Sequence, residues 1–155
     1  MSRIRLFTTY YNETDPQRDR EYRECLERNL ANSVFSELVV LNEGADLSWC
    51  ANQKLSEVNV ETRPTYADFF REINERTGPS DINVMANTDI FFDHNISLLV
   101  DLNLARRCLA LSRWEIKDDG SAELYDHNDS QDCWIFQGPV GDVSADFPVG
   151  VPRCD

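Results

Sequence analysis

The first two-thirds of this chain alternates strand-like and helix-like segments, and this alternation limits the possible folds more than any other feature. Short apolar, β-prone runs occupy residues 4–9, 38–41 and 82–86, and a weaker run covers residues 55–61. Apolar side chains at helical spacing lie between these runs. Strand–helix–strand order produces parallel strands joined by right-handed crossovers. We therefore predict an α/β fold with a doubly wound, mostly parallel sheet and helices on both faces.

Two helices are predicted between these strands. The first begins at Asp15 and Pro16, because aspartate caps helix N-termini and the first helical position does not need the N–H that proline lacks. The second ends at Gly78 and Pro79, a typical helix stop. The apolar residues at helical spacing that form their buried faces are Tyr22, Cys25, Leu26, Leu30, Tyr66, Phe69, Phe70 and Ile73.

The pattern changes past residue 93. A short helix is predicted at 97–104, followed by strands at 108–112 and 134–136. No repeat, linker or low-complexity segment interrupts the 155 residues. Because single domains commonly run to about 100–200 residues, we expect one domain over residues 1–155.

Charge and cysteine usage narrow the partners and the compartment. The chain has 15 basic and 28 acidic residues, a net charge of −13, and no basic stripe, which argues against nucleic acid as a main partner. No apolar run approaches the roughly 18 residues of a membrane span, and no signal-peptide pattern precedes the first strand. The five widely spaced cysteines indicate reduced thiols. We therefore expect a soluble, cytoplasmic protein without a membrane span.

Polar residues follow each strand of the predicted parallel sheet. Because the carboxyl ends of parallel strands meet at one edge, where ligands of α/β proteins bind, these residues are predicted to converge. They are Thr8, Thr9, Tyr10, Asn42, Glu43, Thr62, Arg63, Asn87, Thr88 and Asp89. The alternative is that these loop ends are polar without having any function.

Phosphate binding at this edge would require a cation. The GxGxxG and GxxxxGK(S/T) patterns, which bind phosphates through backbone N–H groups, are both absent from the sequence. Asn87 and Asp89 flank Thr88, and the outer side chains of an extended tripeptide point the same way. These two side chains can therefore share one Mg²⁺ or Mn²⁺ while substrate phosphates fill other positions.

Three segments, residues 38–44, 63–70 and 84–92, resemble the nucleotide-sugar-binding half of GT-A glycosyltransferases. They combine a strand ending in an acidic residue and glycine with a later DXD-type metal motif. The resemblance implies a GT-A-like fold with a Rossmann-like nucleotide-binding half over about residues 1–93. It leaves a short acceptor-side half over about residues 94–155.

The resemblance also implies roles for individual side chains. Thr8 and Tyr10 would surround the nucleoside, Glu43 would contact the uracil edge, and Arg63 would lie near the base. Asp89 would bind the metal, Mn²⁺ or Mg²⁺, although the first aspartate of the usual DXD pattern is an asparagine here. The donor-binding residues that it implies are Thr8, Tyr10, Glu43, Arg63, Asn87 and Thr88.

Asp132 lies just before the aromatic strand predicted at 134–136. GT-A relatives often carry a carboxylate in this region that acts on the acceptor. The resemblance therefore makes Asp132 the candidate general base, which would take the proton of the attacking hydroxyl. Asp129 is a weaker candidate, and His127 could serve as a third metal ligand. The alternative for this acidic stretch is a solvated turn between two strands.

Taken together, the resemblance predicts a metal-dependent hexosyltransferase of the EC 2.4 class. It would move a hexose from a UDP-sugar, UDP-glucose or UDP-galactose, to an acceptor that the sequence does not identify. The alternative is a non-catalytic nucleotide-binding or interaction module on the same fold, because the second half is so short. The two hypotheses differ at Asp132, which catalysis requires to lie beside the ligand site.

Overall fold

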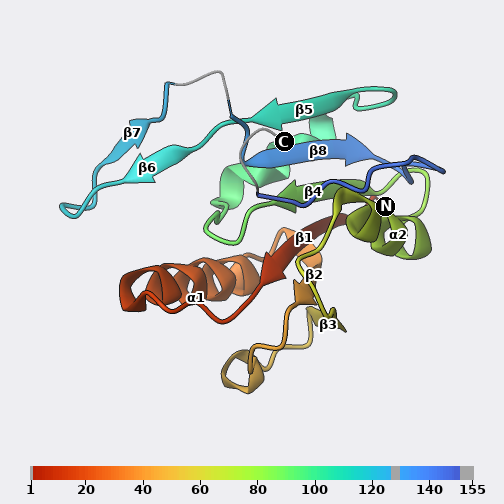
Figure 1. Ribbon diagram of the computed structural model, residues 1–155. Coiled ribbons are helices and arrows are strands. Elements are labelled where there is room, and N and C mark those ends of the chain that lie inside the picture. The colour runs from red at the N-terminus through yellow and green to blue at the C-terminus, as the bar shows by residue number, and fades with distance from the viewer. Residues whose placement is uncertain (1, 127–129, 151–155) are drawn as a thin grey trace.

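The computed structural model describes residues 2–126 and 130–150. A six-stranded sheet in the order β3-β2-β1-β4-β8-β5 forms its centre (Figure 1). The strands are β1 (Ile4–Tyr10), β2 (Phe35–Asn42), β3 (Leu55–Asn59), β4 (Ile82–Ala86), β5 (Cys108–Leu111) and β8 (Cys133–Gln137). Strands β1 to β4 are parallel, whereas β8 runs antiparallel to both β4 and β5. The predicted α/β fold with a mostly parallel sheet is confirmed.

Helices cover both faces of this sheet. They are α1 (Pro16–Ala31), α2 (Tyr66–Arg76) and the 3-10 helices η1 (Ser48–Cys50) and η2 (His94–Asp101). Leu6 of β1 packs in one core with Leu26 of α1, whereas the next residue, Phe7, packs in a second core with Phe69 of α2. Because successive strand residues point to opposite faces, α1 and α2 lie on opposite sides of the sheet (Figure 1). No helix in the described part of the chain is long and apolar enough to span a membrane.

Both α-helices begin where their capping residues predict. The Asp15 carboxylate accepts hydrogen bonds from the N–H groups of Gln17, at 2.8 Å, and Arg18, at 3.3 Å. At the start of α2, Thr65 and Asp68 form a reciprocal capping box. These caps satisfy N–H groups that a helix cannot pair internally, so they fix where each helix starts at the carboxyl edge of the sheet.

A two-stranded ribbon, β6 (Trp114–Ile116) and β7 (Ala122–Leu124), stands beside the main sheet (Figure 1). The sequence analysis did not predict it. The apolar face of the ribbon is open, since Trp114 is 63% exposed and Ile116 is 56% exposed. Each strand alternates apolar and polar residues over only three positions, which is too short to be recognised as a strand from the sequence.

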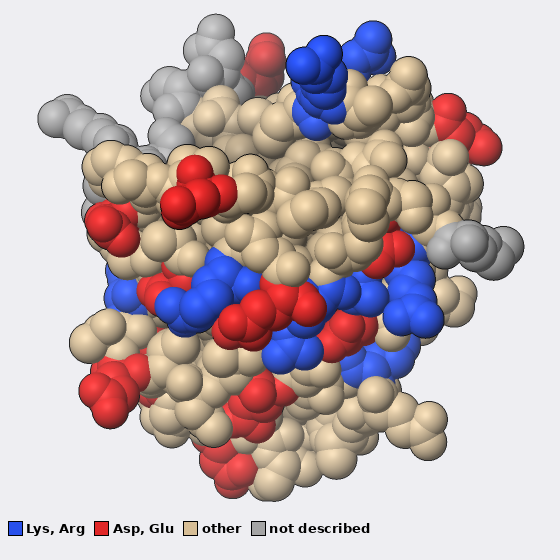
Figure 2. All heavy atoms as spheres, turned by 90° about the vertical axis from the view of Figure 1, so that its right-hand side faces the viewer, with Lys and Arg blue, Asp and Glu red and all other residues tan. Residues whose placement is uncertain are grey.

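A cluster of ion pairs surrounds Arg5 on the α2 face of the sheet. The Arg5 guanidinium is buried and donates to Glu37 at 2.9 Å and to Asp81 at 2.7 Å. Arg76 of α2 extends the cluster through Glu37, at 3.1 Å, and Glu72, at 3.2 Å. Figure 2 shows basic and acidic side chains interleaved in a band across the side of the molecule where α2 lies.

Candidate functional site

The sheet has a topological switch point at the carboxyl ends of β1 and β4. The chain leaves β1 through α1 to reach β2 on one side, whereas β4 lies on the other side of β1. Ligands of α/β proteins bind outside the carboxyl ends of the strands at such a point. We call the residues that meet here the switch-point edge: Thr9, Arg18, Asn87, Thr88, Asp89, Arg113 and Asp132.

Two hydroxyl groups join β1 to the segment after β4. Thr9 Oγ1 lies 2.7 Å from Thr88 Oγ1, and either group can be the donor. Both side chains are half-buried. The contact confirms that polar residues from the ends of these two strands converge, and it leaves each hydroxyl oxygen with further hydrogen-bonding capacity for a ligand.

Asp132 is brought to the same edge by the antiparallel strand β8. Its backbone C=O accepts from the Asn87 N–H at 3.1 Å, and its Oδ1 accepts from Asn87 Nδ2 at 3.2 Å. Its other oxygen, Oδ2, accepts from Arg113 Nη1 at 3.0 Å, so both carboxylate oxygens have partners. Asp132 therefore lies beside the ligand edge, only 9% exposed, and not in a solvated turn.

Arg113 was not predicted as a site residue. It precedes the β6–β7 ribbon, and its guanidinium lies 4.0 Å from the centre of the Tyr125 ring. Burial by itself would lower the pKa of Arg113, but the hydrogen bonds and negative charges of Asp132 and Glu115 together outweigh it, so the pKa is raised. The sequence gives little indication of this residue, because the ribbon strands that follow it are only three residues long.

Asp89 is the accessible carboxylate of the edge. Its side chain is 40% exposed, and its Oδ2 lies 3.7 Å from Arg18 Nη2, which is too long for a hydrogen bond. The pKa of Asp89 is raised, first by partial burial and further by the charge of Asp132, while Arg18 and Arg113 oppose the shift. The negative charge of Asp89 is thus less fully balanced by arginine side chains than that of Asp132.

Arg18 is held in place by Tyr22, one turn further along α1. The Tyr22 hydroxyl accepts from Arg18 Nη2 at 2.8 Å and from Nε at 3.2 Å, and it lies 2.6 Å from the Tyr11 hydroxyl. The sequence analysis missed Arg18. Its position in the first turn of the helix after β1 could have indicated it, because that helix begins at the same edge of the sheet.

The segment that carries Asp89 is anchored to α1. Asn29, only 3% exposed, donates from Nδ2 to the C=O of Ile90 at 2.9 Å and accepts at Oδ1 from the N–H of Phe92 at 3.0 Å. These two bonds fix the backbone immediately after Asp89. The helix therefore positions the site segment as well as covering the sheet.

Two of the predicted donor-binding residues, Thr8 and Tyr10, do not reach the edge through their side chains. Tyr10 is 3% exposed and packs in the α1-side core against Tyr22 and Trp49, because its place in β1 turns it to that face. Thr8 points to the same face and is 6% exposed. Glu43 touches the β1 end through its backbone, where its N–H donates to the Tyr10 C=O at 2.9 Å.

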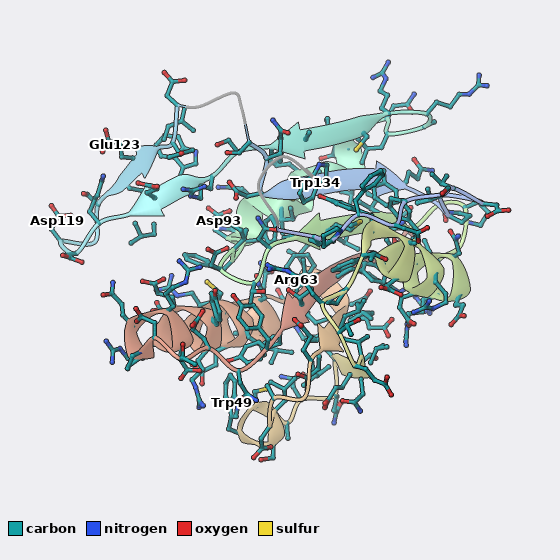
Figure 3. All side chains as sticks on the ribbon, viewed as in Figure 1. Trp49, Arg63, Asp93, Asp119, Glu123 and Trp134 are labelled. Carbon is teal, nitrogen blue, oxygen red and sulfur yellow. The ribbon has the colours of Figure 1, made fainter. Side chains whose placement is uncertain are left out.

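Arg63, labelled in Figure 3, is exposed and interacts with the end of the described chain. Its Nε donates to the C=O of Val149 at 3.0 Å, and its Nη2 donates to the C=O of Gly150 at 3.3 Å. Gly150 in turn approaches Asn87. Arg63 thus borders the switch-point edge through this C-terminal segment.

The described residues do not form a preassembled metal cage. Within residues 2–126 and 130–150, no group of three or more histidine, cysteine, aspartate or glutamate side chains is placed to hold a metal ion. His127 and Asp129 lie outside the described residues. Asp89 still fits a divalent cation that arrives with its ligand, because Mg²⁺ is commonly held by one or two carboxylates plus substrate phosphates. Asp132 is less available to a cation, since each of its oxygens already accepts a hydrogen bond and Arg113 balances its charge.

Two cavities lie away from the switch-point edge, and none of its residues lines them. One, of about 460 Å³, lies between the β2–β3 connection and β3, where Asp46 and Glu57 are among its lining residues. The other, of about 500 Å³, lies near the start of β1 and is lined in part by Ser36 and Val100.

Comparison with known proteins identifies the fold. No protein-family model and no curated protein matches this sequence. Among solved structures, the chain is similar to 4-diphosphocytidyl-2C-methyl-D-erythritol synthase from Anaerococcus prevotii, with a TM-score of 0.50 and 13% identity over 88% of this chain and 71% of the other. At this identity the likeness concerns the fold alone, which is GT-A-like.

The same comparison corrects the predicted activity. The resemblance to GT-A glycosyltransferases led us to expect hexosyl transfer from a UDP-sugar, and this expectation is wrong. The solved structure that shares the fold is a synthase of a diphosphocytidyl compound, not a glycosyltransferase. The sequence segments that resemble glycosyltransferases indicate the shared α/β fold and not the reaction, because one fold serves many activities.

Proposed function

We propose that this protein binds a nucleoside phosphate at the switch-point edge. The observation that supports the proposal is the convergence, at one topological switch point, of the hydroxyl pair Thr9–Thr88, the amide of Asn87 and the accessible carboxylate of Asp89. Hydroxyl and amide groups can bind ribose and phosphate oxygens. The carboxylate can bind a cation that accompanies the phosphates.

We propose further that the nucleotide binds as its Mg²⁺ or Mn²⁺ complex. The chain carries a net charge of −13, so phosphates without a cation would be repelled. Asp89 is the residue that would hold the metal, since Arg18 approaches it only at 3.7 Å. The metal supplies charge neutralisation of the phosphates, and Thr9, Thr88 and Asn87 orient the rest of the ligand.

Pyrimidine nucleotides are the proposed ligand class. The structure that shares the fold makes a diphosphocytidyl compound, and the segments that resemble GT-A proteins suggest uridine nucleotides. Cytidine and uridine diphosphates, together with UDP-glucose and UDP-galactose as binding ligands, are therefore the first compounds to test.

Isothermal titration calorimetry tests this proposal. The parent protein is titrated with CDP, UDP, ADP and GDP, first in the presence of Mg²⁺ and then in the presence of EDTA. We expect binding that depends on Mg²⁺ and that Asp89→Asn weakens at least about tenfold. Asp101→Asn, at the exposed end of η2, is the matched control and should bind as the parent does. A parent protein that binds none of these nucleotides would overturn the proposal.

A catalytic role at the nucleotide phosphates is the second candidate function. It is favoured by the position of Asp132 beside the edge and by the synthase that shares the fold. Because both Asp132 oxygens are engaged, its part would be to position Asn87 and Arg113. Phosphorus NMR of CTP or UTP incubated with the protein and Mg²⁺ tests for cleavage of the phosphate chain. If the nucleotide spectra do not change although binding is measurable, the protein binds the nucleotide without cleaving it, and this second candidate function is contradicted.

A further inference from the structure

The last described residues form a strap across the start of α2. We call residues 145–150 the C-terminal strap. Its backbone C=O groups at Ala145 and Phe147 accept from the first N–H groups of α2, each at 2.9 Å. The Val149 N–H donates to the C=O of Pro64 at 3.1 Å, and the Ala145 and Val149 side chains are buried. The strap is therefore docked along its length, with its end directed to the switch-point edge.

The strap ends between Arg63 and Asn87. The carbonyl groups of Val149 and Gly150 accept from the Arg63 guanidinium at 3.0 and 3.3 Å. Gly150 has a φ of +68°, and a Cβ added to it would lie 3.4 Å from Arg63 Nη2 and 3.7 Å from Asn87 Oδ1. The end of the strap thus fills the space that separates Arg63 from the proposed nucleotide site.

Arg63 differs from the other arginines near this edge in its partners. Arg18 and Arg113 each lie within ion-pair distance of carboxylates, whereas no described carboxylate lies within that distance of Arg63. Its two partners are neutral carbonyl groups. A phosphate carries negative charge and can accept two parallel hydrogen bonds from one guanidinium, whereas a backbone carbonyl is neutral and accepts through a single oxygen. A phosphate would therefore be a better partner for Arg63 than the strap.

We propose that Arg63 is a phosphate-binding residue of the nucleotide site and that the C-terminal strap is its gate. This inference rests on the proposed nucleotide binding. In the free protein the strap carbonyls occupy the Nε donor and one Nη2 donor of Arg63, along one edge of the guanidinium. On binding, the nucleotide phosphates replace the Val149 and Gly150 carbonyls, and the end of the strap moves away from Asn87. The strap therefore competes with the ligand and lowers its apparent affinity.

A thermodynamic cycle with UDP and Mg²⁺ tests the gate. Gly150→Ala strains the strap end, because an alanine disfavours the positive φ, so it should tighten UDP binding roughly three- to tenfold. Gly120→Ala, at a φ of +81° in the β6–β7 turn, is the matched control and should leave binding unchanged. Arg63→Ala should weaken binding at least about tenfold and abolish the effect of Gly150→Ala. Arg107→Ala, another arginine that donates to a backbone carbonyl, should have no effect.

The outcomes separate this inference from the proposed function. Suppose that the parent binds UDP but that Gly150→Ala does not bind it more tightly, or that Gly150→Ala tightens binding by the same factor in the Arg63→Ala background. Either result would show that the strap does not compete with the ligand for Arg63, so the inference would fail while nucleotide binding stands. If the parent binds no nucleotide, the proposed function itself fails. Hydrogen exchange in the unmodified chain gives an independent readout. The Val149 amide should exchange faster with UDP and Mg²⁺ present, and slower or unchanged exchange would contradict the gate.

Discussion

The partners of a carboxylate decide what it can do, and Asp132 and Asp89 illustrate this at the residue scale. Asp132 accepts from Asn87 and Arg113, so it is a positioning residue that ties β8 to the end of β4. Asp89 keeps 40% of its side chain exposed and has only a distant arginine partner. The two residues carry the same chemical group, yet only Asp89 is free to meet a ligand.

Asp132→Asn is expected to destabilise the fold even without ligand. The substitution removes the charge opposite Arg113, and a hydrogen bond to a charged group contributes about 1.5–3 kcal/mol. Because the Arg113 side chain is 32% exposed, we expect a loss near the lower end of this range in urea unfolding. Glu115→Gln removes the second, more exposed partner of Arg113 and should cost less. Equal stability of the two variants would contradict the assigned role.

The pKa values around Arg5 lead to a prediction about acid stability. Burial alone would raise the pKa of Glu37 and Asp81, but hydrogen bonds to Ser56 and Arg5 for Glu37, and to Arg5 for Asp81, hold both below their usual values of 4.5 and 3.8. A carboxylate with a lowered folded-state pKa stabilises the fold above its usual pKa, and this stabilisation is lost as pH falls through the lowered value.

The melting temperature should therefore fall as pH is lowered from about 4.5 toward 2. Asp81→Asn should be less stable at pH 7 and should show a shallower fall with pH, because one of the titrating groups is gone. Calorimetry between pH 2 and 7 measures both effects. The same slope in Asp81→Asn and in the parent would show that the Arg5 cluster does not control acid stability.

At the element scale, α1 both covers the sheet and holds the site segment. Asn29 is a polar residue on the buried face of the helix, and its two bonds to the backbone of Ile90 and Phe92 fix the segment after Asp89. A polar side chain is kept in this core because it satisfies backbone groups that β4 leaves unpaired where it ends.

Asn29→Ala should release this segment. Removing the amide leaves a buried C=O and a buried N–H without their partner, which costs about 1–3 kcal/mol for each unsatisfied group. We expect faster hydrogen exchange at Phe92 and weaker nucleotide binding with α1 otherwise intact. Asn74→Ala, which removes similar bonds to Val140 and Gly141 on the exposed side of α2, is the control and should leave Phe92 unaffected. Unchanged exchange at Phe92 in Asn29→Ala would contradict this function of α1.

The sequence predicts the elements whose signals are local. Apolar runs predict strands β1 to β4, and apolar side chains at helical spacing, with the start at Asp15 and the stop at Gly78, predict both α-helices. Strand ends predict the meeting of Thr9 with Thr88. The insertion of β8 between β4 and β5 is a long-range pairing that no local pattern encodes. Tyr10 was misplaced because a strand pattern alone does not say which face a terminal residue takes. Arg113 was missed because the strands of the ribbon beside it are only three residues long, too short for their alternation to predict a strand.

At the scale of the whole molecule, fold and charge point to a ligand that arrives with its own cation. The carboxyl edge of the sheet offers hydroxyls, an amide and one accessible carboxylate, while the chain carries a net charge of −13. A fold shared with a diphosphocytidyl compound synthase is compatible with many reactions, so the edge, and not the fold, must identify the ligand.

An amide chemical-shift titration of the isotope-labelled protein with UDP and Mg²⁺ tests whether a nucleotide binds at the switch-point edge, because it reports both binding and its location. We expect saturable shifts at Thr9, Asn87, Thr88 and Asp89 and in the C-terminal strap, and we expect EDTA to abolish them. Shifts confined to the cavity lined by Asp46 and Glu57, or no shifts at all, would contradict nucleotide binding at the switch-point edge.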